Sequence, residues 1–388
     1  MDFGIWNFRR LLPLAFTLLL LLPTLLPATA APALPTPAAG AFRYQNPITS
    51  GIDPRGLRDC QVFRDRDPAT GRDKWFLTGT AHPVWPREDK FGLLNPGVVL
   101  YSSDDLIHWK FERVLVRPNP DKWYFQRFWA PEIHRINNKY YLTFNCRNDL
   151  LGDNILRTGY AIADTLHGPY RPLEKPLAEG NDLTLYQDDD PDRTTYAIWN
   201  ATMEPGADRA RVRDFGIAIA KIDLPTGRLL TAPVTLIRPG PHPEWDSVGI
   251  EGAHIIKRNN TYYLFYSSWT RGYEIGYATA PAITGPWTKH PRNPLLGGQT
   301  PADCRRNKIP YTGAPDAVYS HIGHNAIFTG PDDRLWLSCH AILRADPDQI
   351  PMLLIDPLDF APDGAITTPA PTSTPQTIPL PKKTTNTH

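Results

Sequence analysis

The sequence predicts an all-β fold, a five-bladed β-propeller whose central channel carries the active site. Between residues 42 and 365 the chain shows short strand patterns with frequent turns, and no 15-residue amphipathic helix interrupts them. The composition is rich in turns and aromatic rings, with 42 Pro and 11% Phe, Trp and Tyr among 388 residues. One segment pattern also recurs five times, and each repeat has room for about four short strands, the content of one propeller blade.

The N-terminus has the pattern of a secretory signal peptide. A pair of arginines precedes an apolar run, Leu11 to Leu26, and Ala28-Thr29-Ala30 then offers small residues for cleavage. A membrane anchor is the alternative, but the run is short and prolines interrupt it, which favours a cleaved signal over residues 1–30. We therefore expect a secreted or periplasmic protein with no stable membrane association after cleavage.

Two segments outside the repeats have the composition of linkers. Residues 31–41 are rich in Ala and Pro and are predicted to connect the signal peptide to the domain. Residues 366–388 are rich in Pro and Thr and are predicted to form a disordered tail. Residues 42–365 are then the propeller domain.

The five repeats share one plan, an apolar strand, a polar turn and an aromatic-rich strand. Three of them align without a gap, from Trp129 (WAPEIHRINNKYYL), Glu251 (EGAHIIKRNNTYYL) and His324 (HNAIFTGPDDRLWL), and two with longer turns start at Asp59 and Asp182. The starts are 70, 53, 69 and 73 residues apart, so the repeat continues across any midpoint of the chain. A pair of sandwiches, the alternative fold, would interrupt it.

Charge and cysteine content exclude several classes of function. Lys and Arg number 41 against 40 Asp and Glu, so the basic excess of a nucleic-acid-binding protein is missing. The four cysteines match no zinc-ribbon spacing, and three lie in or beside apolar strand patterns, where a buried free thiol is expected. Gly-x-Ser-x-Gly and His-Glu-x-x-His are both absent. We expect a monomer.

The first residue of each repeat is the candidate site. The innermost strand of every blade begins at the central channel, so these first residues should converge; they are Asp59, Trp129, Asp182, Glu251 and His324. Glycoside hydrolysis uses two carboxyl groups that flank the scissile bond, and the acid among them needs a raised pKa. An aromatic wall stacks against a sugar ring. The five residues therefore indicate a sugar-cleaving site.

Each of these residues also has an ordinary structural interpretation. A single acid at a strand end is commonly solvated, and a single Trp or His more often belongs to a packed interior. Three acids at one repeat position favour the catalytic interpretation. The run from Asp188 to Asp190 falls at a repeat turn and is predicted to be a solvated hairpin tip, and Asn259-Asn260-Thr261 is a glycosylation sequence in a tight turn.

At these residues the sequence resembles glycoside hydrolase family 43, the five-bladed propeller arabinanases, arabinofuranosidases and β-xylosidases, over most of residues 42–361. The resemblance implies that Asp59 is the general base and Glu251 the general acid. It implies that Asp182 orients the sugar and modulates the pKa of the acid. Trp129 would line the sugar subsite, and His324 would lie near the channel axis.

Further candidates lie inside the same motifs. Glu132 and His254 are predicted to bind substrate together with Trp129 and His324. Arg344 is the candidate for a late substrate-contacting arginine of the family. The sequence departs from the family pattern at Cys60 and Ala253, where Pro is usual.

The mechanism implied is a single displacement with inversion. Asp59 activates water and Glu251 protonates the leaving oxygen, which needs a carboxyl separation of about 6.5–9.5 Å. No cofactor is required, although the resemblance implies a candidate Ca²⁺ in the central channel, held by His324 through water. The expected substrates are α-L-arabinofuranosyl or β-D-xylosyl linkages in plant polysaccharides or oligosaccharides. The alternatives are a non-catalytic carbohydrate-binding propeller and a related propeller glycosidase or phosphorylase of different sugar specificity.

Overall fold

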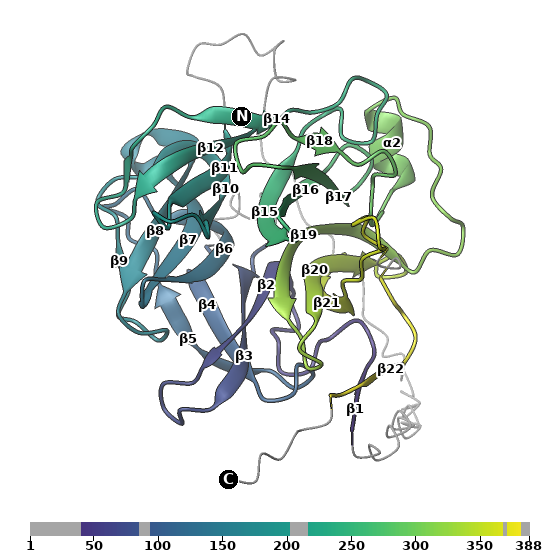
Figure 1. The fold of residues 1–388 in the computed structure, drawn as a ribbon, viewed down its shortest axis with the longest axis horizontal. Helices are drawn as coiled ribbons and strands as arrows, with labels where there is room; N and C mark the ends of the chain where they lie inside the picture. The colour runs from purple at the N-terminus through teal and green to yellow at the C-terminus, as the bar shows by residue number, and fades with distance from the viewer. Residues whose placement is uncertain (1–39, 85–93, 202–215, 368–370, 382–388) are drawn as a thin grey trace, which may run out of the picture. The chain divides into compact units, whose positions relative to one another are not determined.

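The computed structural model describes residues 40–84, 94–201, 216–367 and 371–381, and these form an almost entirely β domain (Figure 1). The predicted signal peptide and residues 31–39 of the predicted linker lie outside the described residues. Within the described ranges, no helix is long and apolar enough to cross a membrane.

The strands follow one another in five blades, as the repeats predict. Their bounds are β2 Leu57–Arg66, β3 Asp73–Ala81, β4 Val98–Ser103 and β5 Lys110–Val116 in blade 1; β6 Gln126–Ile136, β7 Lys139–Asn148, β8 Asp153–Ala163 and β9 Arg171–Pro172 in blade 2; β10 Ala178–Gln187, β11 Thr195–Ala201, β12 Gly216–Asp223, β13 Arg228–Leu229 and β14 Val234–Ile237 in blade 3; β15 Glu251–Arg258, β16 Thr261–Ser268, β17 Glu274–Ala280 and β18 Thr288–Lys289 in blade 4; and β19 Tyr319–Thr329, β20 Leu335–Leu343 and β21 Pro351–Pro357 in blade 5. Two short helical segments, η1 Asp149–Leu151 and α2 Pro301–Arg306, lie in connections. Strand pairing within the blades is antiparallel throughout, and β8 and β10 pair briefly, joining blades 2 and 3.

The hydrophobic core lies between neighbouring blades. Apolar residues of each sheet face those of the next, as where Phe76 and Leu100 of blade 1 meet Phe128 and Phe144 of blade 2. Five such clusters are found among the described residues, and each joins consecutive blades or closes blade 5 onto blade 1. Burying apolar area there leaves the innermost strands, which lie around the middle of the domain (Figure 1), free to carry polar side chains.

The N-terminal segment completes blade 5. Ile48 bridges Leu353 of β21, and the Asn46 side chain exchanges two 3.0 Å hydrogen bonds with the backbone of Ile355. This supplies the outer edge of a sheet that otherwise has three strands. An edge paired in this way is not open to another chain.

The prediction of a disordered tail over residues 366–388 is wrong for part of that range. Residues Gln376–Pro379 form β22, which pairs antiparallel with β1, Ala41–Tyr44. Thr372 also donates from its hydroxyl to buried Asp356 at 2.6 Å. The Pro/Thr composition resembles that of a disordered segment, but Ile378 packs on the core between blades 5 and 1, which offsets the entropy of ordering it. Ala41, expected in the linker, belongs to the domain.

Two smaller predictions have opposite outcomes. The four cysteines are all buried free thiols, as expected for three of them. The prediction of a solvated hairpin tip for the three aspartates is wrong for Asp188, which is buried and accepts a 2.8 Å hydrogen bond from the Tyr262 hydroxyl, whereas Asp189 is exposed. Asp189 pairs with Lys257, so this turn of blade 3 binds blade 4.

A β-bulge interrupts all five innermost strands at the same place. Each ladder shifts register there, and one residue of each bulge has φ between 45° and 64°: Asp59, Ala130, Asp182, Gly252 and His324. These five are the equivalent positions. The predicted column is therefore wrong by one residue in two blades, because Trp129 and Glu251 lie one residue before the bulge. An ungapped alignment could not detect this, since a bulge adds a residue without changing the strand pattern.

Candidate active site

A chain of hydrogen bonds between blades holds the bulges in place. At four of the five blade junctions, the bulge N–H donates to a side chain on the second strand of the preceding blade. The donor and acceptor residues are Ala130 to Thr80 (2.8 Å), Asp182 to Asn145 (2.8 Å), His324 to Ser267 (2.8 Å) and Asp59 to His340 (3.1 Å). At the remaining junction, Gly252 N–H donates to Asp182 Oδ2 at 3.0 Å. The bulges thus place their side chains at one end of the channel.

Asp59 is surrounded by donors and cations. Thr80 Oγ1 donates to Asp59 Oδ2 at 2.6 Å, and Arg58 Nε donates to the same oxygen at 3.2 Å. Burial alone raises the pKa of this carboxyl, but Arg58, the two histidines His324 and His340, and the Thr80 hydroxyl outweigh burial and hold the pKa well below its usual value. Asp59 is therefore ionised across the neutral range.

Glu251 has the opposite electrostatic environment. Its Oε1 accepts a 2.8 Å hydrogen bond from the Tyr273 hydroxyl, and its Oε2 accepts a 2.9 Å bond from Asn181 Nδ2. Burial and the neighbouring Asp182 raise the pKa of Glu251 to about 7. The Tyr273 bond lowers it only in part. Glu251 is therefore the group that holds a proton near neutral pH.

Asp182 and His324 lie between these two carboxyl groups. Asp182 Oδ1 accepts from Asn145 Nδ2 at 2.9 Å, and His324 Nδ1 is 3.6 Å from Asp59 Oδ1 and 3.7 Å from Asp182 Oδ2. Burial and Asp59 raise the pKa of Asp182, while His324 and the amide donors oppose that shift. Burial lowers the pKa of His324, but the two aspartates reverse that effect and raise it. Because Asp182 receives more donors than Glu251, we assign the shared proton to Glu251.

Trp129 lies at the edge of this group. Its ring is half-buried, and the guanidinium groups of Arg58 and Arg127 are 5.1 and 4.9 Å from the ring centre. Since Arg58 also contacts Asp59, it connects the aromatic residue to the acids. The structure thus brings together Asp59, Trp129, Asp182, Glu251 and His324 as predicted.

Glu132 and His254 lie one layer deeper in the channel. Two residues beyond each bulge, the channel-facing positions are Gln61, Glu132, Thr184, His254 and Ala326. Glu132 Oε2 accepts from Thr184 Oγ1 at 2.7 Å and is 3.0 Å from His134 Nε2, and His254 Nε2 accepts from Ile327 N–H at 3.2 Å. The Thr184 and Ile327 contacts join neighbouring blades, whereas Glu132 and His134 belong to the same strand. The assignment of Glu132 and His254 to substrate binding stays a prediction.

Several site residues escaped sequence reasoning. They are Arg58, Thr80, Asn181, Tyr273 and His340. Arg58 and Asn181 precede their bulges and so share the position of Glu251 and Trp129, and aligning the repeats on the bulge would have found them. Tyr273 lies in a connection after β16 and gave no repeat signal. Arg344 is not available as a substrate contact, because it donates to the backbone oxygens of Tyr319 and Gln299.

Metal binding is the remaining question for His324. Its Nδ1 lies near the carboxylates of Asp59 and Asp182. Across the described ranges, no group of three or more His, Cys, Asp or Glu side chains is arranged to hold a metal ion. A Ca²⁺ held through water stays a prediction.

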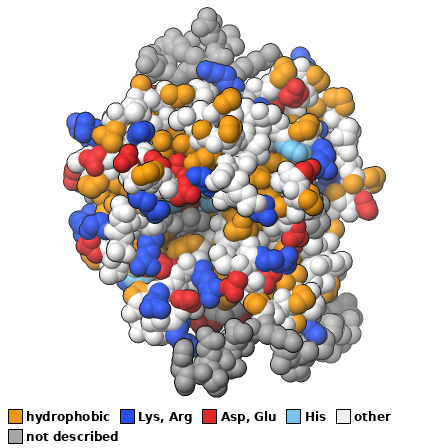
Figure 2. Space-filling view, in the orientation of Figure 1, with side chains coloured by type: hydrophobic (Ala, Val, Ile, Leu, Met, Phe, Trp, Pro, Cys, Tyr) orange, Lys and Arg blue, Asp and Glu red, His pale blue; other side chains and the backbone are white. Residues whose placement is uncertain are grey.

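Basic, acidic and apolar side chains are interspersed on the face drawn in Figure 2, which shows no extended basic patch among the described residues.

Comparison with known proteins gives one family. The sequence profile of Glycosyl hydrolases family 43 matches residues 44–366. A xylan 1,3-beta-xylosidase from a Vibrio species is 27% identical over 270 residues, covering 65% of this chain and 43% of that protein. An extracellular exo-alpha-(1->5)-L-arabinofuranosidase from Streptomyces chartreusis is 28% identical over 292 residues, covering 70% of this chain and 79% of that protein. This chain thus spans less than half the length of the Vibrio relative.

The fold is also found in solved structures. The crystal structure of a thermostable family-43 glycoside hydrolase superimposes with a TM-score of 0.65 at 25% identity, covering 86% of this chain and 98% of that one. The match to a whole chain of this family agrees with the five-bladed arrangement described above.

Proposed function

Since this chain belongs to glycosyl hydrolase family 43, we propose that it hydrolyses glycosidic bonds with Asp59 and Glu251 as its two catalytic carboxyl groups. The observation that carries the proposal is the opposite shift of their pKa values. Asp59 is held well below its usual value, and Glu251 is raised to about 7. Two carboxyl groups at one site whose pKa values are driven apart are the acid and base pair that glycoside hydrolysis requires.

Each group of the site then has one task. Ionised Asp59 takes a proton from the attacking water, and protonated Glu251 gives its proton to the leaving oxygen. Asp182 keeps Glu251 protonated and orients the sugar, and Arg58 keeps Asp59 ionised. Water attacks on the face opposite the leaving group, so the anomeric configuration inverts.

The proposed substrates are α-L-arabinofuranosyl or β-D-xylosyl linkages of plant polysaccharides or oligosaccharides. The names of two relatives support this choice, since one is a xylosidase and the other an arabinofuranosidase. Trp129 supplies an aromatic surface beside the acids on which a sugar ring could stack. We propose that the protein acts as a secreted or periplasmic monomer and requires no cofactor, and that any Ca²⁺ in the channel binds near His324.

Leaving-group dependence tests the assignment of Glu251. Glu251→Gln should reduce kcat on xylan and arabinan oligosaccharides by about 10²–10⁴-fold, because an alkoxide leaves poorly without a proton. Aryl glycosides with acidic phenols should lose far less, since the phenolate leaves unaided. Asp59→Asn should reduce both substrate types alike. Equal loss on both types by Glu251→Gln would contradict its role as acid, and retention of configuration, followed by NMR, would contradict the single displacement.

A further inference from the structure

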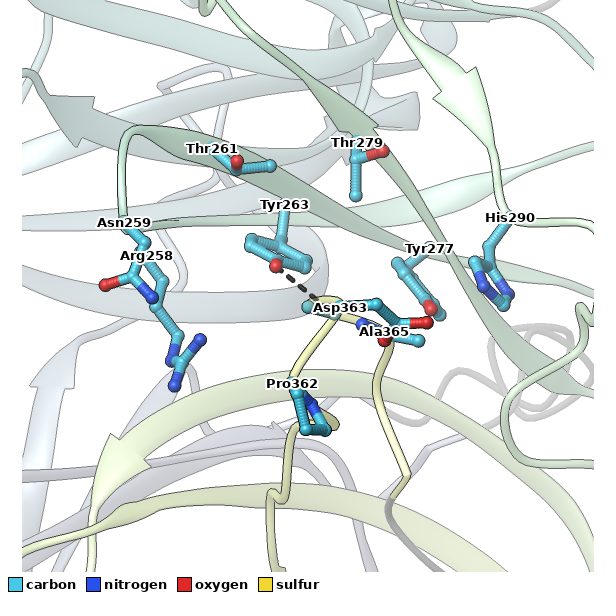
Figure 3. A pocket seen from close by; sticks show the side chains of 11 residues that line it. Arg258, Asn259, Thr261, Tyr263, Tyr277, Thr279, His290, Pro362, Asp363 and Ala365 are labelled. Carbon is cyan, nitrogen blue, oxygen red and sulfur yellow. Dashed lines mark hydrogen bonds between the residues drawn. The ribbon is translucent and has the colours of Figure 1, made fainter.

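A cavity of about 320 Å³ lies at the end of blade 4 where the β15–β16 turn is found (Figure 3). Its polar lining comes from three elements that the fold brings together. These residues are Arg258, Asn259 and Thr261 around the β15–β16 turn, Thr279 of β17 with His290 beyond it, and Asp363 after β21. A cavity of this size is at the lower end of small-ligand sites in proteins.

The direction of β15 separates this cavity from the catalytic residues. The strand begins at Glu251 and ends at Arg258, so the two lie about 23 Å apart at 3.3 Å per residue. A single sugar cannot contact both places. The cavity is therefore a separate feature of the molecule.

Two tyrosines form the inner wall and use their hydroxyls to hold it. Tyr263 donates to the Gly364 backbone oxygen at 2.9 Å, and the Tyr277 hydroxyl accepts from Ile366 N–H at 3.2 Å. These bonds fix the segment after β21 against blade 4. His290 stacks on Tyr277 with ring centres 4.6 Å apart. The wall is thus rigid and partly aromatic.

The polar lining combines donors and acceptors without net charge. The Arg258 guanidinium lies 4.5 Å from the Phe360 ring centre, and within the described part of the chain no carboxylate forms an ion pair with it. Asp363 supplies one carboxylate, of which Oδ1 accepts from Ala365 N–H. Burial lowers the pKa of His290, so its ring is neutral. The positive charge of Arg258 and the negative charge of Asp363 therefore cancel.

This lining selects the chemical class of ligand. An anion would face Asp363, a cation would face Arg258, and an apolar molecule would leave the hydroxyls and amide of the lining unsatisfied. Sugar hydroxyls both donate and accept, and a sugar ring also has apolar C–H faces. We propose that this cavity binds a neutral sugar unit of a polysaccharide chain whose cleavage occurs elsewhere, an inference that rests on the proposed function.

A second contact of this kind raises the local concentration of polymer at the enzyme. Binding at the cavity makes the encounter between polymer and active site partly intramolecular. A short substrate that fills only the active site gains nothing. The cavity should therefore affect polymer hydrolysis and leave aryl glycoside hydrolysis unchanged.

One turn offers a matched pair of variants. Asn259 and Asn260 both have positive φ, 48° and 59°, so glycine fits either position, but only Asn259 lines the cavity. Asn259→Gly and the isosteric Thr279→Val remove lining groups, and Asn260→Gly is the control. Production in a host without N-glycosylation is needed, since Asn259 begins a glycosylation sequence.

The measurement is retardation in gels that contain arabinan or xylan, in a Glu251→Gln background that slows cleavage. The combined Asn259→Gly and Thr279→Val variant should bind one of the polymers severalfold more weakly than the Asn260→Gly control. With Glu251 restored, kcat/KM should fall severalfold on polymer and stay unchanged on an aryl glycoside.

Equal retardation of both variants, or no retardation of the parent in either gel, would overturn the inference. Hydrolysis of the aryl glycoside by the parent reports on the proposed function separately. Failure of that activity would leave the gel comparison intact.

Discussion

Replacing Tyr273 with Phe removes the hydroxyl that donates a 2.8 Å hydrogen bond to Glu251 Oε1. The ring itself stays, and it stacks on His340 with centres 5.4 Å apart. The pKa of Tyr273 is raised well above 10 by burial and by Glu251, so the hydroxyl is a donor at every assay pH. The substitution therefore deletes one donor to one carboxylate.

The expected effect is a higher pKa for Glu251. A hydrogen bond to a charged group contributes about 1.5–3 kcal/mol, which corresponds to roughly 1–2 pKa units. The Tyr273 bond lowers the pKa of Glu251, and without it the value should rise from about 7 to about 8–9. Glu251 would then stay protonated at higher pH.

The assay is the pH dependence of kcat/KM on an oligosaccharide, whose basic limb reports the acid of the free enzyme. In Tyr273→Phe the limb should move upward by one to two pH units. Tyr262→Phe is the control, because its hydroxyl also donates to a buried carboxylate, Asp188, outside the site. An unmoved or lowered limb in Tyr273→Phe would refute the role of this hydroxyl, whatever happens to kcat.

Two further predictions concern stability. Because folding raises the pKa of Glu251 from 4.5 to about 7, the parent loses stability as pH rises through that interval. The free energy of unfolding of Glu251→Gln, measured in urea, should therefore rise relative to that of the parent by up to about 3 kcal/mol between pH 4.5 and 8. A difference between the two proteins that does not change with pH would contradict the cost of burying a charged Glu251. Ending the chain at Thr367 removes β22 and the Thr372 bond to Asp356. A loss of about 2–3 kcal/mol in a domain of this size should lower the melting temperature by roughly 3–4 °C in calorimetry, and no change would show that β22 adds nothing.

The sequence by itself determined the class of fold and the residues proposed to carry the chemistry of the site. The strand and turn pattern recurs along the chain, and each blade forms mainly from residues that are close in sequence, so five blades could be counted. Asp59, Asp182 and Glu251 could be selected because three acids fall at the same position of the repeat. Trp129 and His324 were selected by the same repeat position, and Glu132 and His254 lie inside the motifs that carry the family resemblance.

The tertiary structure decided how those residues are used. Relative to the bulge of their own blade, Glu251 and Trp129 stand one residue earlier than Asp59 and Asp182 do. This local difference in the backbone leaves no mark on the strand pattern. Burial raises the pKa of both carboxyl groups, and the difference between an ionised Asp59 and a protonated Glu251 comes from their neighbours. Arg58 and His324 act on Asp59, and Asp182 acts on Glu251. His324 and Asp182 belong to other blades than the carboxyl groups they act on.

Residues 366–388 are a second case in which sequence composition alone did not predict the structure. Their Pro/Thr composition favours disorder, and only the strand they form with residues more than 300 positions earlier reverses that expectation. Hydrogen bonds and charges act over a few ångströms of space, whereas most of the partners concerned are separated by tens to hundreds of residues of chain. Local pattern therefore predicts the blades and the residue types, and only the closed ring of blades decides which group keeps its proton.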